Sequence, residues 1–557
     1  MSFAAGQGTS RPMDTRAIPQ TQIPHTSRLF QDYLYDYARV SEFYSAPPFA
    51  PESFQQAAHR VEYPDALRAA VIHAVREQYE ARPAGQETIR NLERFAKPGC
   101  CAVVTGQQVG LFTGPAFTLY KALTAIKLAR TLSEQGIEAV PVFWLATEDH
   151  DLAEVNHCFV QDRDGKPVRL EYSEPAQVLN APVGAVGFNA AIRPVTESLR
   201  MLLPDSPDAK ELCDRVEEFY RPGCHLGWSF ARLLDSLFAT HGVILLDSSD
   251  PWLHRLSSNV FRTAVECAGE ISNELRDRNE QLIKAGYHAQ VRVTESSTLL
   301  FLYEQGQRSA LHLVDGKFQS PLGNSYEPAA LLNMLEENPS LFSPNVLLRP
   351  VMQDALLPTV AYVGGPSEIA YLAQAAPLYD RFFRSNGGRM PVIFPRANFT
   401  VLDAASNRLL GKYGLELTDV FAGKQLLREK MAARFLPEGL AGLFGKATAS
   451  LGEDMEAIKQ GLGKLDPTLV DAASNSAQKM QYQLSNLEHK ANAAVQKRSD
   501  QVEKDAQRLE NNLYPEKTLQ ERLYGGISLL ARFGLPLLDR LYEQISLTSA
   551  DHQILTP

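Results

Sequence analysis

Four consecutive ionisable residues, Glu148, Asp149, His150 and Asp151, directly follow the apolar run "AVPVFWLAT" at 139–147. A short run of apolar, β-branched and aromatic residues predicts a buried strand, and open α/β sheets bind their ligands beyond the carboxyl ends of the strands. Repulsion between neighbouring carboxylates can provide an acid and a base, or a cation-holding cluster, within one short stretch. We therefore predict that Glu148, Asp149 and His150 are catalytic. The alternative is that Asp149 or Asp151 only caps the next helix.

The stretch "VVTGQQVGLFTGPAFTLYK" at 103–121 combines glycines with a helix start. It predicts a strand that ends near Val104, a loop, and a helix in which Thr113 or Gly114 is the N-cap and Pro115 the first residue. Such a loop exposes backbone N–H groups next to the positive end of a helix, so a phosphate or a carboxylate is the expected ligand. The predicted binding residues here are Thr105, Gly106, Gln107, Gln108, Gly110, Thr113, Gly114, Thr118 and Lys121.

Within this stretch, Gly114, Thr118 and Lys121 are spaced to lie on one helix face, which predicts a hydroxyl and an ammonium facing the ligand. The alternative is a tight turn with Lys121 in solvent. The glycine spacing matches neither the dinucleotide-binding fingerprint nor the Walker A motif.

A second candidate site lies in "LLRPVMQDALLPTVAYVGGPSEIAYLAQ" at 347–374. Arg349 and Gln353 follow an apolar run, and Gly364, Gly365 and Glu368 repeat the order of strand, glycine turn and helix. We predict that these five residues bind substrate or nucleotide. Arg396 closes a further apolar run, and it is either a carboxylate anchor or a surface charge.

Composition limits the classes of partner. The chain has 557 residues and a net charge of −10, which argues against nucleic acid or an anionic membrane as the main partner. It has neither an N-terminal signal peptide nor an apolar run long enough to span a bilayer, so we expect a cytoplasmic protein. The six cysteines form no CxxC pair, so we expect reduced thiols. His157-Cys158 and Cys224-His225 could form a Cys₂His₂ zinc site if the fold joined them, but chance adjacency is the simpler explanation, and we expect no metal site.

Short apolar runs at 102–106, 139–147, 242–247, 345–352, 358–365 and 390–396 alternate with helix-length segments. This alternation predicts an α/β fold with a parallel, doubly wound sheet. We expect an N-terminal extension and helical segment at 1–95 and a catalytic core at 96–415 with insertions at about 160–240 and 255–340. A helical arm at 416–514 and a C-terminal helical segment at 515–557, returning to the core, complete the expected organisation.

The arm carries a long amphipathic pattern. Residues 467–514 lack glycine and space Met480, Leu484, Leu487 and Ala491 by fours and threes, which predicts a helix of about 45 residues. We expect it to pair with the preceding helical segment as an antiparallel coiled coil and to form a homodimer contact. The alternative is a helical arm that no second subunit covers.

The segments "TGQQVGLFTGPAFTLYKA", "PVFWLATEDHDLAEVNH" and "LLRPVMQDALLPTVAYVGGPSEIAY", with the late coiled-coil stretch, together resemble the BshC family of bacillithiol biosynthesis cysteine-adding enzymes. The resemblance covers nearly the whole chain. It implies a Rossmann-like core with connecting-peptide insertions, distantly related to class I aminoacyl-tRNA synthetases, and a coiled coil that mediates dimerisation. It also implies ligation of cysteine to the amine of glucosaminyl-malate. The chain has no HIGH or KMSKS motif, so ATP with magnesium follows only by analogy.

The implied substrates match the candidate residues. Loop 105–115, Lys121 and Arg349 could hold carboxylates, while Glu148, Asp149 and His150 could orient an amine or take its proton. Two other function classes stay open: another nucleotide-dependent ligase or transferase on the same fold, and a non-catalytic coiled-coil assembly protein that binds a metabolite. The acidic run favours an enzyme, because a scaffold gains nothing from clustered carboxylates in a cleft.

Overall fold

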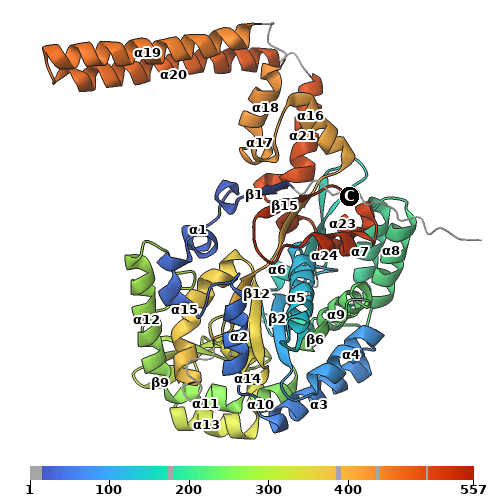
Figure 1. Cartoon of the computed structure of the whole chain (residues 1–557). Coiled ribbons are helices and arrows are strands. Elements are labelled where there is room, and N and C mark those ends of the chain that lie inside the picture. Colours follow the sequence, from blue (N-terminus) through green and yellow to red (C-terminus); the bar gives the residue numbers. More distant parts are fainter. Residues whose placement is uncertain (1–15, 174–180, 384–389, 435–438, 497–499) are drawn as a thin grey trace, which may run out of the picture. The chain divides into compact units, whose positions relative to one another are not determined.

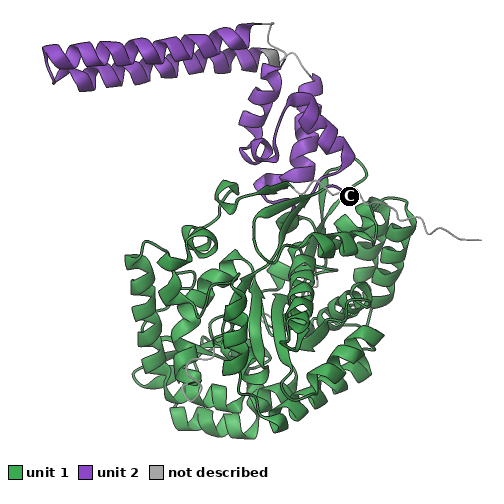
Figure 2. Cartoon of the chain, viewed as in Figure 1, with its two compact units in different colours: residues 1–400, 521–555, 557 green, residues 401–520, 556 purple. Residues whose placement is uncertain are grey.

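The computed structural model describes residues 16–173, 181–383, 390–434, 439–496 and 500–557 (Figure 1). The chain forms two compact units, coloured separately in Figure 2. Unit 1 consists of residues 1–400 and 521–555, and unit 2 consists of residues 401–520. No helix among the described residues combines the length and the apolarity needed to cross a membrane.

The centre of unit 1 is a parallel sheet of five strands, which confirms the expected fold class. The strands are β2 (Cys101–Gln108), β3 (Ala139–Ala146), β6 (Ile244–Asp247), β12 (Thr359–Gly364) and β13 (Val392–Pro395). Their order in the sheet is β13-β12-β2-β3-β6, with every neighbouring pair parallel. The first strand therefore lies in the middle, and the winding reverses between β2 and β12. In such sheets this reversal point is where ligands bind.

One expected strand is wrong. The run 345–352 forms most of helix α14 (Leu348–Leu356) instead. The Asn345 side chain accepts hydrogen bonds from the backbone N–H groups of Leu347 and Leu348, and so satisfies donors at the start of this helix. A short apolar run cannot distinguish a buried strand from a buried helix by periodicity alone.

Alternate residues of β2 face two hydrophobic layers. Ala102 and Val104 pack into the layer that contains residues of α3 (Asp65–Ala81), α4 (Gln86–Phe95) and α15 (Pro366–Phe382). Cys101 and Val103 pack into the layer that contains residues of α2 (Pro51–Arg60) and α5 (Phe117–Glu134). Because both faces of the sheet are covered, its polar chemistry is confined to the strand ends.

Two long insertions separate the sheet strands. Between β3 and β6 lie α6 (Leu152–Val155), β4 (His157–Gln161), β5 (Pro167–Glu171), α7 (Ile192–Leu202), α8 (Pro207–Phe219) and α9 (Leu226–Leu237). Between β6 and β12 lie α10 (Pro251–Leu256), α11 (Ser258–Glu266), α12 (Ala268–Lys284), α13 (Pro328–Glu337), α14 and an antiparallel sheet. That sheet contains β7 (Ser297–Glu304), β8 (Gln307–Val314), β9 (Lys317–Gln319), β10 (Ser325–Tyr326) and β11 (Phe342–Pro344). Within it, β7 and β8 pair through the turn Gln305-Gly306, where both residues have positive φ, as a type I′ hairpin requires.

Unit 1 ends with the segment that follows unit 2 in the sequence. It contains α22 (Gln520–Leu523), α23 (Gly526–Phe533), α24 (Leu537–Gln544) and β15 (His552–Leu555). Helices α22 to α24 lie within the segment expected to be helical, but residues 552–555 near the end of the chain form a strand. β15 pairs antiparallel with β1 (Arg16–Ile18) and lies between β1 and β14 (Asn398–Val401).

Unit 2 is helical. It contains α16 (Ala404–Tyr413), α17 (Leu417–Phe421), α18 (Lys424–Ala433), α19 (Leu440–Leu465), α20 (Leu469–Gln496) and α21 (Asp500–Leu513). The turn at Asp466 and Pro467 folds α20 back along α19, which confirms the expected antiparallel pair (Figure 1). Residues 497–499 of the expected long helix lie outside the described residues, so α20 and α21 are treated as separate helices.

Candidate functional site

A cavity of about 620 Å³ lies at the carboxyl ends of the central strands of unit 1. Its lining includes Gly106, Gln107 and Gln108 from β2, and Glu148, Asp149 and His150 from the turn after β3. Ser248 follows β6, while Gly365, Glu368 and Tyr371 belong to the β12–α15 turn and to α15. Residues 148–150 thus face the same cavity as residues 106–108 at the end of β2.

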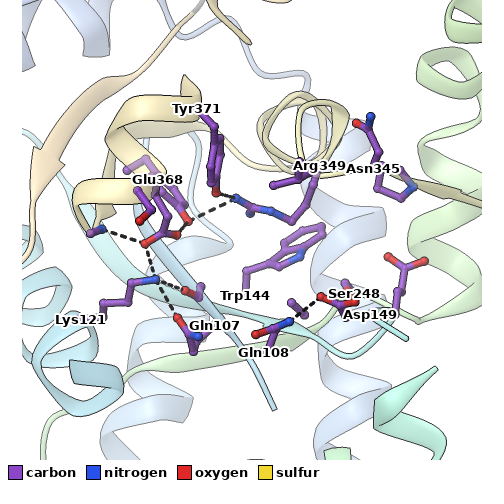
Figure 3. Close-up of a pocket in the computed structure, with 18 of the residues that line it drawn as sticks. Gln107, Gln108, Lys121, Trp144, Asp149, Ser248, Asn345, Arg349, Glu368 and Tyr371 are labelled. Carbon is purple, nitrogen blue, oxygen red and sulfur yellow. Dashed lines mark hydrogen bonds and ion pairs between the residues drawn. The ribbon is translucent and has the colours of Figure 1, made fainter. Parts of the chain in front are cut away.

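Lys121, from α5, holds one side of this cavity together. Its ammonium donates hydrogen bonds to the carbonyl of Gly106 (2.7 Å) and to Oε1 of Gln107 (3.0 Å), and it lies 2.5 Å from Oε2 of Glu368. Figure 3 shows the Lys121 side chain directed at Gln107 and Glu368. Burial lowers the pKa of Lys121, while Glu368 opposes that shift. Because an ammonium has three protons and Lys121 has three partners, this group is fully satisfied within the protein.

Glu368 caps α15 and links Lys121 to an aromatic group. Its Oε2 accepts the N–H of Gly365 (2.8 Å), and its Oε1 accepts the hydroxyl proton of Tyr362 (2.6 Å). Burial opposes ionisation of this carboxyl, but Lys121 and these hydrogen bonds hold its pKa below the ordinary value. Glu368 is therefore a carboxylate at neutral pH.

Arg349, from α14, extends the same network. It donates to the hydroxyls of Tyr371 (2.7 Å) and Tyr362 (3.3 Å) and to Oε1 of Gln353 (3.1 Å). Gln353 is completely buried and does not line the cavity, so it supports Arg349 instead of contacting a ligand. In Figure 3, Arg349 and Tyr371 lie beside Glu368, and Trp144 lies between this group and Gln108.

The opposite side of the cavity is acidic. Oδ2 of Asp149 accepts a hydrogen bond from Nε2 of Gln108 (2.6 Å), and its Oδ1 accepts the backbone N–H of His150 (2.7 Å). Burial disfavours the charged carboxyl, but these hydrogen bonds and Arg308 hold the pKa of Asp149 below its usual range. Asp149 is therefore an anion whose orientation is fixed by its neighbours.

The ring of His150 is bound by Arg308, from β8 of the second insertion. NH1 of Arg308 lies 3.1 Å from Nδ1 of His150. A guanidinium can only donate, so Nδ1 accepts and the imidazole proton is on Nε2. Burial and the charge of Arg308 lower the pKa of His150, which makes the ring neutral at pH 7. In this arrangement His150 presents a hydrogen-bond donor.

Glu148 is held by a histidine from α10. Nε2 of His254 lies 3.0 Å from Oε1 of Glu148 and 3.2 Å from the carbonyl of Ser248. His254 is buried, and Glu148 has only 6% of its surface exposed. Burial opposes protonation, but the Glu148 carboxylate and its hydrogen bond raise the pKa of His254 above the ordinary value. Glu148 and His254 thus form a buried pair at the cavity wall.

Several predicted binding residues lie outside the cavity. Thr105, Gly110, Thr113, Gly114, Thr118 and Gly364 are absent from its lining. Thr105 donates to the carbonyl of Val363, while Oγ1 of Thr113 accepts the N–H of Ile527. Gly114 has a φ of +61°, and its carbonyl accepts the N–H of Gly526. The predicted ligand-facing stripe is therefore wrong for Gly114 and Thr118, because this part of the loop packs against the C-terminal segment.

The start of the helix also differs from the prediction. β2 continues to Gln108, so Thr105–Gln108 is strand and not loop. α5 begins at Phe117 with Ala116 as its N-cap, two residues beyond the expected start at Pro115. The backbone N–H of Ala116 donates to the carbonyl of Tyr524, so this N–H at the start of α5 is bound within the protein.

Sequence reasoning missed Arg308, His254 and Arg522 as residues of the site. Arg308 and Arg522 line the cavity, and His254 supports Glu148. Arg308 is 158 residues from His150 in the sequence, so no local pattern connects them. No group of three or more potential metal ligands from His, Cys, Asp and Glu occurs among the described residues.

Comparisons with known proteins agree with this architecture. Residues 13–397 match the family model "Bacillithiol biosynthesis BshC, N-terminal Rossmann-like domain", and residues 399–557 match "Bacillithiol biosynthesis BshC, C-terminal coiled-coil domain". The chain is 42% identical to "Putative cysteine ligase BshC" of Solibacter usitatus, over 98% of this chain and 100% of the relative. Proteins of the same name from Koribacter versatilis and Salinibacter ruber are 39% and 32% identical, over 97% and 94% of this chain and 99% and 95% of the relatives. The chain belongs to the BshC family of bacillithiol biosynthesis proteins.

Proposed function

We propose that this chain is a ligase that joins cysteine to the amine of glucosaminyl-malate, the last step of bacillithiol biosynthesis. The relatives carry the name "Putative cysteine ligase BshC". The observation that carries the proposal is the separation of charge across one cavity. Asp149 and Glu148 lie on one side, where Arg308 is bound by His150. On the other side, among the described residues, lie four cations, with Glu368 as the one carboxylate: Lys121, Arg349, Arg396 and Arg522.

This separation suits a substrate with an amine at one end and carboxylates at the other. An ammonium gains from the carboxylates of Asp149 and Glu148, whereas the malyl carboxylates gain from the arginine-rich side. Trp144 and Tyr371 also line the cavity and offer apolar surface to a sugar ring. In the reverse orientation, the ammonium of the substrate would lie near the arginines and its carboxylates near Asp149 and Glu148, so like charges would repel.

The chemistry of amide formation assigns roles to the acidic side. The substrate ammonium must lose a proton before its nitrogen can attack, and a carboxylate at Asp149 or Glu148 can accept it. The nitrogen then forms a C–N bond with the carboxyl carbon of cysteine, from which an oxygen leaves with the bonding electrons. The Nε2–H of His150 is placed to donate a hydrogen bond to a developing negative charge.

The carboxyl group of cysteine is a poor electrophile, and ATP with magnesium would supply its activation. The residues at the start of α15 do not fit a phosphate group, because the Glu368 carboxylate already accepts the N–H of Gly365 there. No step is therefore derived through a nucleotide, and ATP with magnesium is a variable of the experiment.

The test uses the purified full chain with glucosaminyl-malate and cysteine, with and without ATP and magnesium. Mass spectrometry should detect a thiol whose mass is the sum of both substrates less one water. Absence of this product under all conditions would overturn the proposal. Substrate trapping followed by mass spectrometry would then show whether the chain is a different nucleotide-dependent ligase or only binds a metabolite.

We also propose a homodimer that forms through the helical arm. Large apolar side chains are exposed along α19 and α20 in the single chain, namely Leu443, Ile458, Leu465, Met480, Tyr482 and Leu487. A partner of the same sequence would cover them. All six cysteines are free, which agrees with a reducing compartment, and we propose the cytoplasm.

A further inference from the structure

Arg522 reaches the cavity from the segment that follows unit 2 in the sequence. The preceding residue, Glu521, is completely buried. Its Oε1 accepts a hydrogen bond from Arg396 (2.7 Å), and its Oε2 accepts the N–H of Phe399 (3.0 Å). Both oxygens of Glu521 are thus engaged, and the carboxylate nearest to Arg522 in the sequence is not its hydrogen-bond partner.

The backbone around Arg522 is fixed on both sides. Glu521 anchors the chain before it, and the carbonyl of Tyr524, two residues later, accepts the N–H of Ala116 (2.8 Å). Tyr524 is buried, whereas Arg522 is exposed. The fold therefore holds the main chain in place and leaves the guanidinium accessible at the cavity wall.

The other cations that line the cavity are bound by protein groups. Lys121 has three partners, and Arg349 donates to Tyr371 and Gln353. Arg308 donates to His150, Ser343 and the carbonyl of Pro344, and Arg396 to Glu521 and the carbonyl of Ala397. Within the described ranges of the chain, Arg522 makes no hydrogen bond or ion pair. Among these cavity cations it is therefore the one whose donors are all available to a ligand.

We propose that Arg522 binds a carboxylate of the malyl group and thereby makes this site specific for an acidic sugar substrate. This inference rests on the proposed function, and it adds a residue that determines which substrate is accepted. A guanidinium presents a planar fork of donors that matches the two oxygens of a carboxylate. Arg522 lies in the same cavity as Asp149, so a substrate could place its carboxylates at Arg522 and its amine at Asp149.

Three variants test this role. Arg522→Gln removes the charge, Arg522→Lys keeps the charge but loses the fork, and Arg540→Gln removes an exposed arginine of the same segment that does not line the cavity. Steady-state rates are measured while glucosaminyl-malate, cysteine and ATP are varied in turn. Calorimetry measures the binding of glucosaminyl-malate and of malate alone, which needs no turnover.

Arg522→Gln should raise the KM for glucosaminyl-malate roughly 10- to 100-fold, because a charge-assisted hydrogen bond is lost. The KM of Arg522→Lys for glucosaminyl-malate should fall between those of the parent and of Arg522→Gln. The KM for cysteine should stay the same in all variants, and Arg540→Gln should have the parent's KM for glucosaminyl-malate. If Arg522→Gln binds glucosaminyl-malate and malate with unaltered affinity, the inference is overturned. The same holds if only the KM for ATP increases. If the parent forms no product but binds malate through Arg522, the proposed reaction fails and the carboxylate site stands.

Discussion

The ammonium of Lys121 lies 2.5 Å from Oε2 of Glu368, and this pair joins α5 to the start of α15. The side chain of Lys121 is only 3% exposed, and that of Glu368 is 17% exposed. The same ammonium binds the carbonyl of Gly106 and the side chain of Gln107. Lys121 therefore connects β2 to the turn after β12, across the point where the winding of the sheet reverses, and both members of the pair line the cavity.

Replacement of Lys121 by Met should destabilise the protein. It would leave the Glu368 carboxylate without its cation, and breaking a buried pair by removing one partner typically costs about 3–5 kcal/mol. Urea titration should show this loss of unfolding free energy, and the double variant Lys121→Met/Glu368→Gln should lose less than the sum of the single variants. Normal stability with a raised KM would instead mean that Lys121 contacts the ligand directly.

Asp149 and His150 should be required for turnover and not for folding. Both line the cavity, and their side chains are about one-third exposed. Asp149→Asn and His150→Gln keep the size of each group but remove the charge or the ring, so we expect product formation to fall at least about 100-fold. The unfolding temperature should change little. A large loss of stability with normal specific activity would show that Asp149 is only a structural capping residue.

His552 should make the protein sensitive to acid. It is buried, and Nε2 lies 2.8 Å from Oγ1 of Thr400. Burial and the charge of Arg396 lower the pKa of His552 to about 4, against the opposing effect of Glu521. As the pH falls, the histidine of the unfolded chain is therefore protonated at a higher pH than that of the folded chain. The free energy of unfolding thus decreases as the pH falls from about 6.5 towards 4. Above pH 7 the histidine is neutral in both states and does not change the stability.

A His552→Gln variant isolates this contribution. At pH 7.5 it should be less stable than the parent, because the imidazole fits its site. Between pH 7.5 and pH 5 the difference in unfolding free energy should shrink by about 2 kcal/mol, since only the parent loses the histidine contribution. Denaturant titration at the two pH values measures this change. A difference that stays constant would exclude His552 as the titrating group.

The sequence predicted the parts of the site that follow directly from strand ends. β2, β3 and β12 are short apolar runs bounded by breakers, so the sequence located all three, although β2 extends four residues beyond its predicted end. Glu148 to His150 were located because they follow β3. The parallel sheet then places these residues beside Gln107 and Gln108. The local sequence pattern and the sheet topology are therefore sufficient to predict the residues of the site that follow the strand ends.

The rest of the site depends on contacts between distant segments. Arg308 and His254 come from the second insertion, and Arg522 comes from beyond unit 2. The loop at Gly114 shows a different limit. A glycine that a turn needs for a φ of +61° has the same sequence signature as a glycine that lets a ligand approach the backbone. Only the packing of residues 524–527 against this loop distinguishes the two.

The exposed apolar side chains of the arm lead to a prediction about assembly. Leu487 is 57% exposed and Leu484 is partly buried, although both lie on the expected seam of α20. A second chain that covers them would bury apolar surface worth about 25 cal/mol per Å². The parent should therefore behave in light scattering as a particle of twice the chain mass of 61.7 kDa.

Charged replacements in this seam should shift the mass towards that of the single chain. Leu484→Glu/Leu487→Glu would place carboxylates in the contact, where their desolvation is costly. Ser485→Glu adds the same charge at an exposed polar position of α20 and serves as the control, so this variant should remain dimeric. Circular dichroism must show that α20 remains helical in the variants. A parent protein that is already monomeric would contradict the proposed assembly, and the arm would then be a helical hairpin that no second copy of this chain covers.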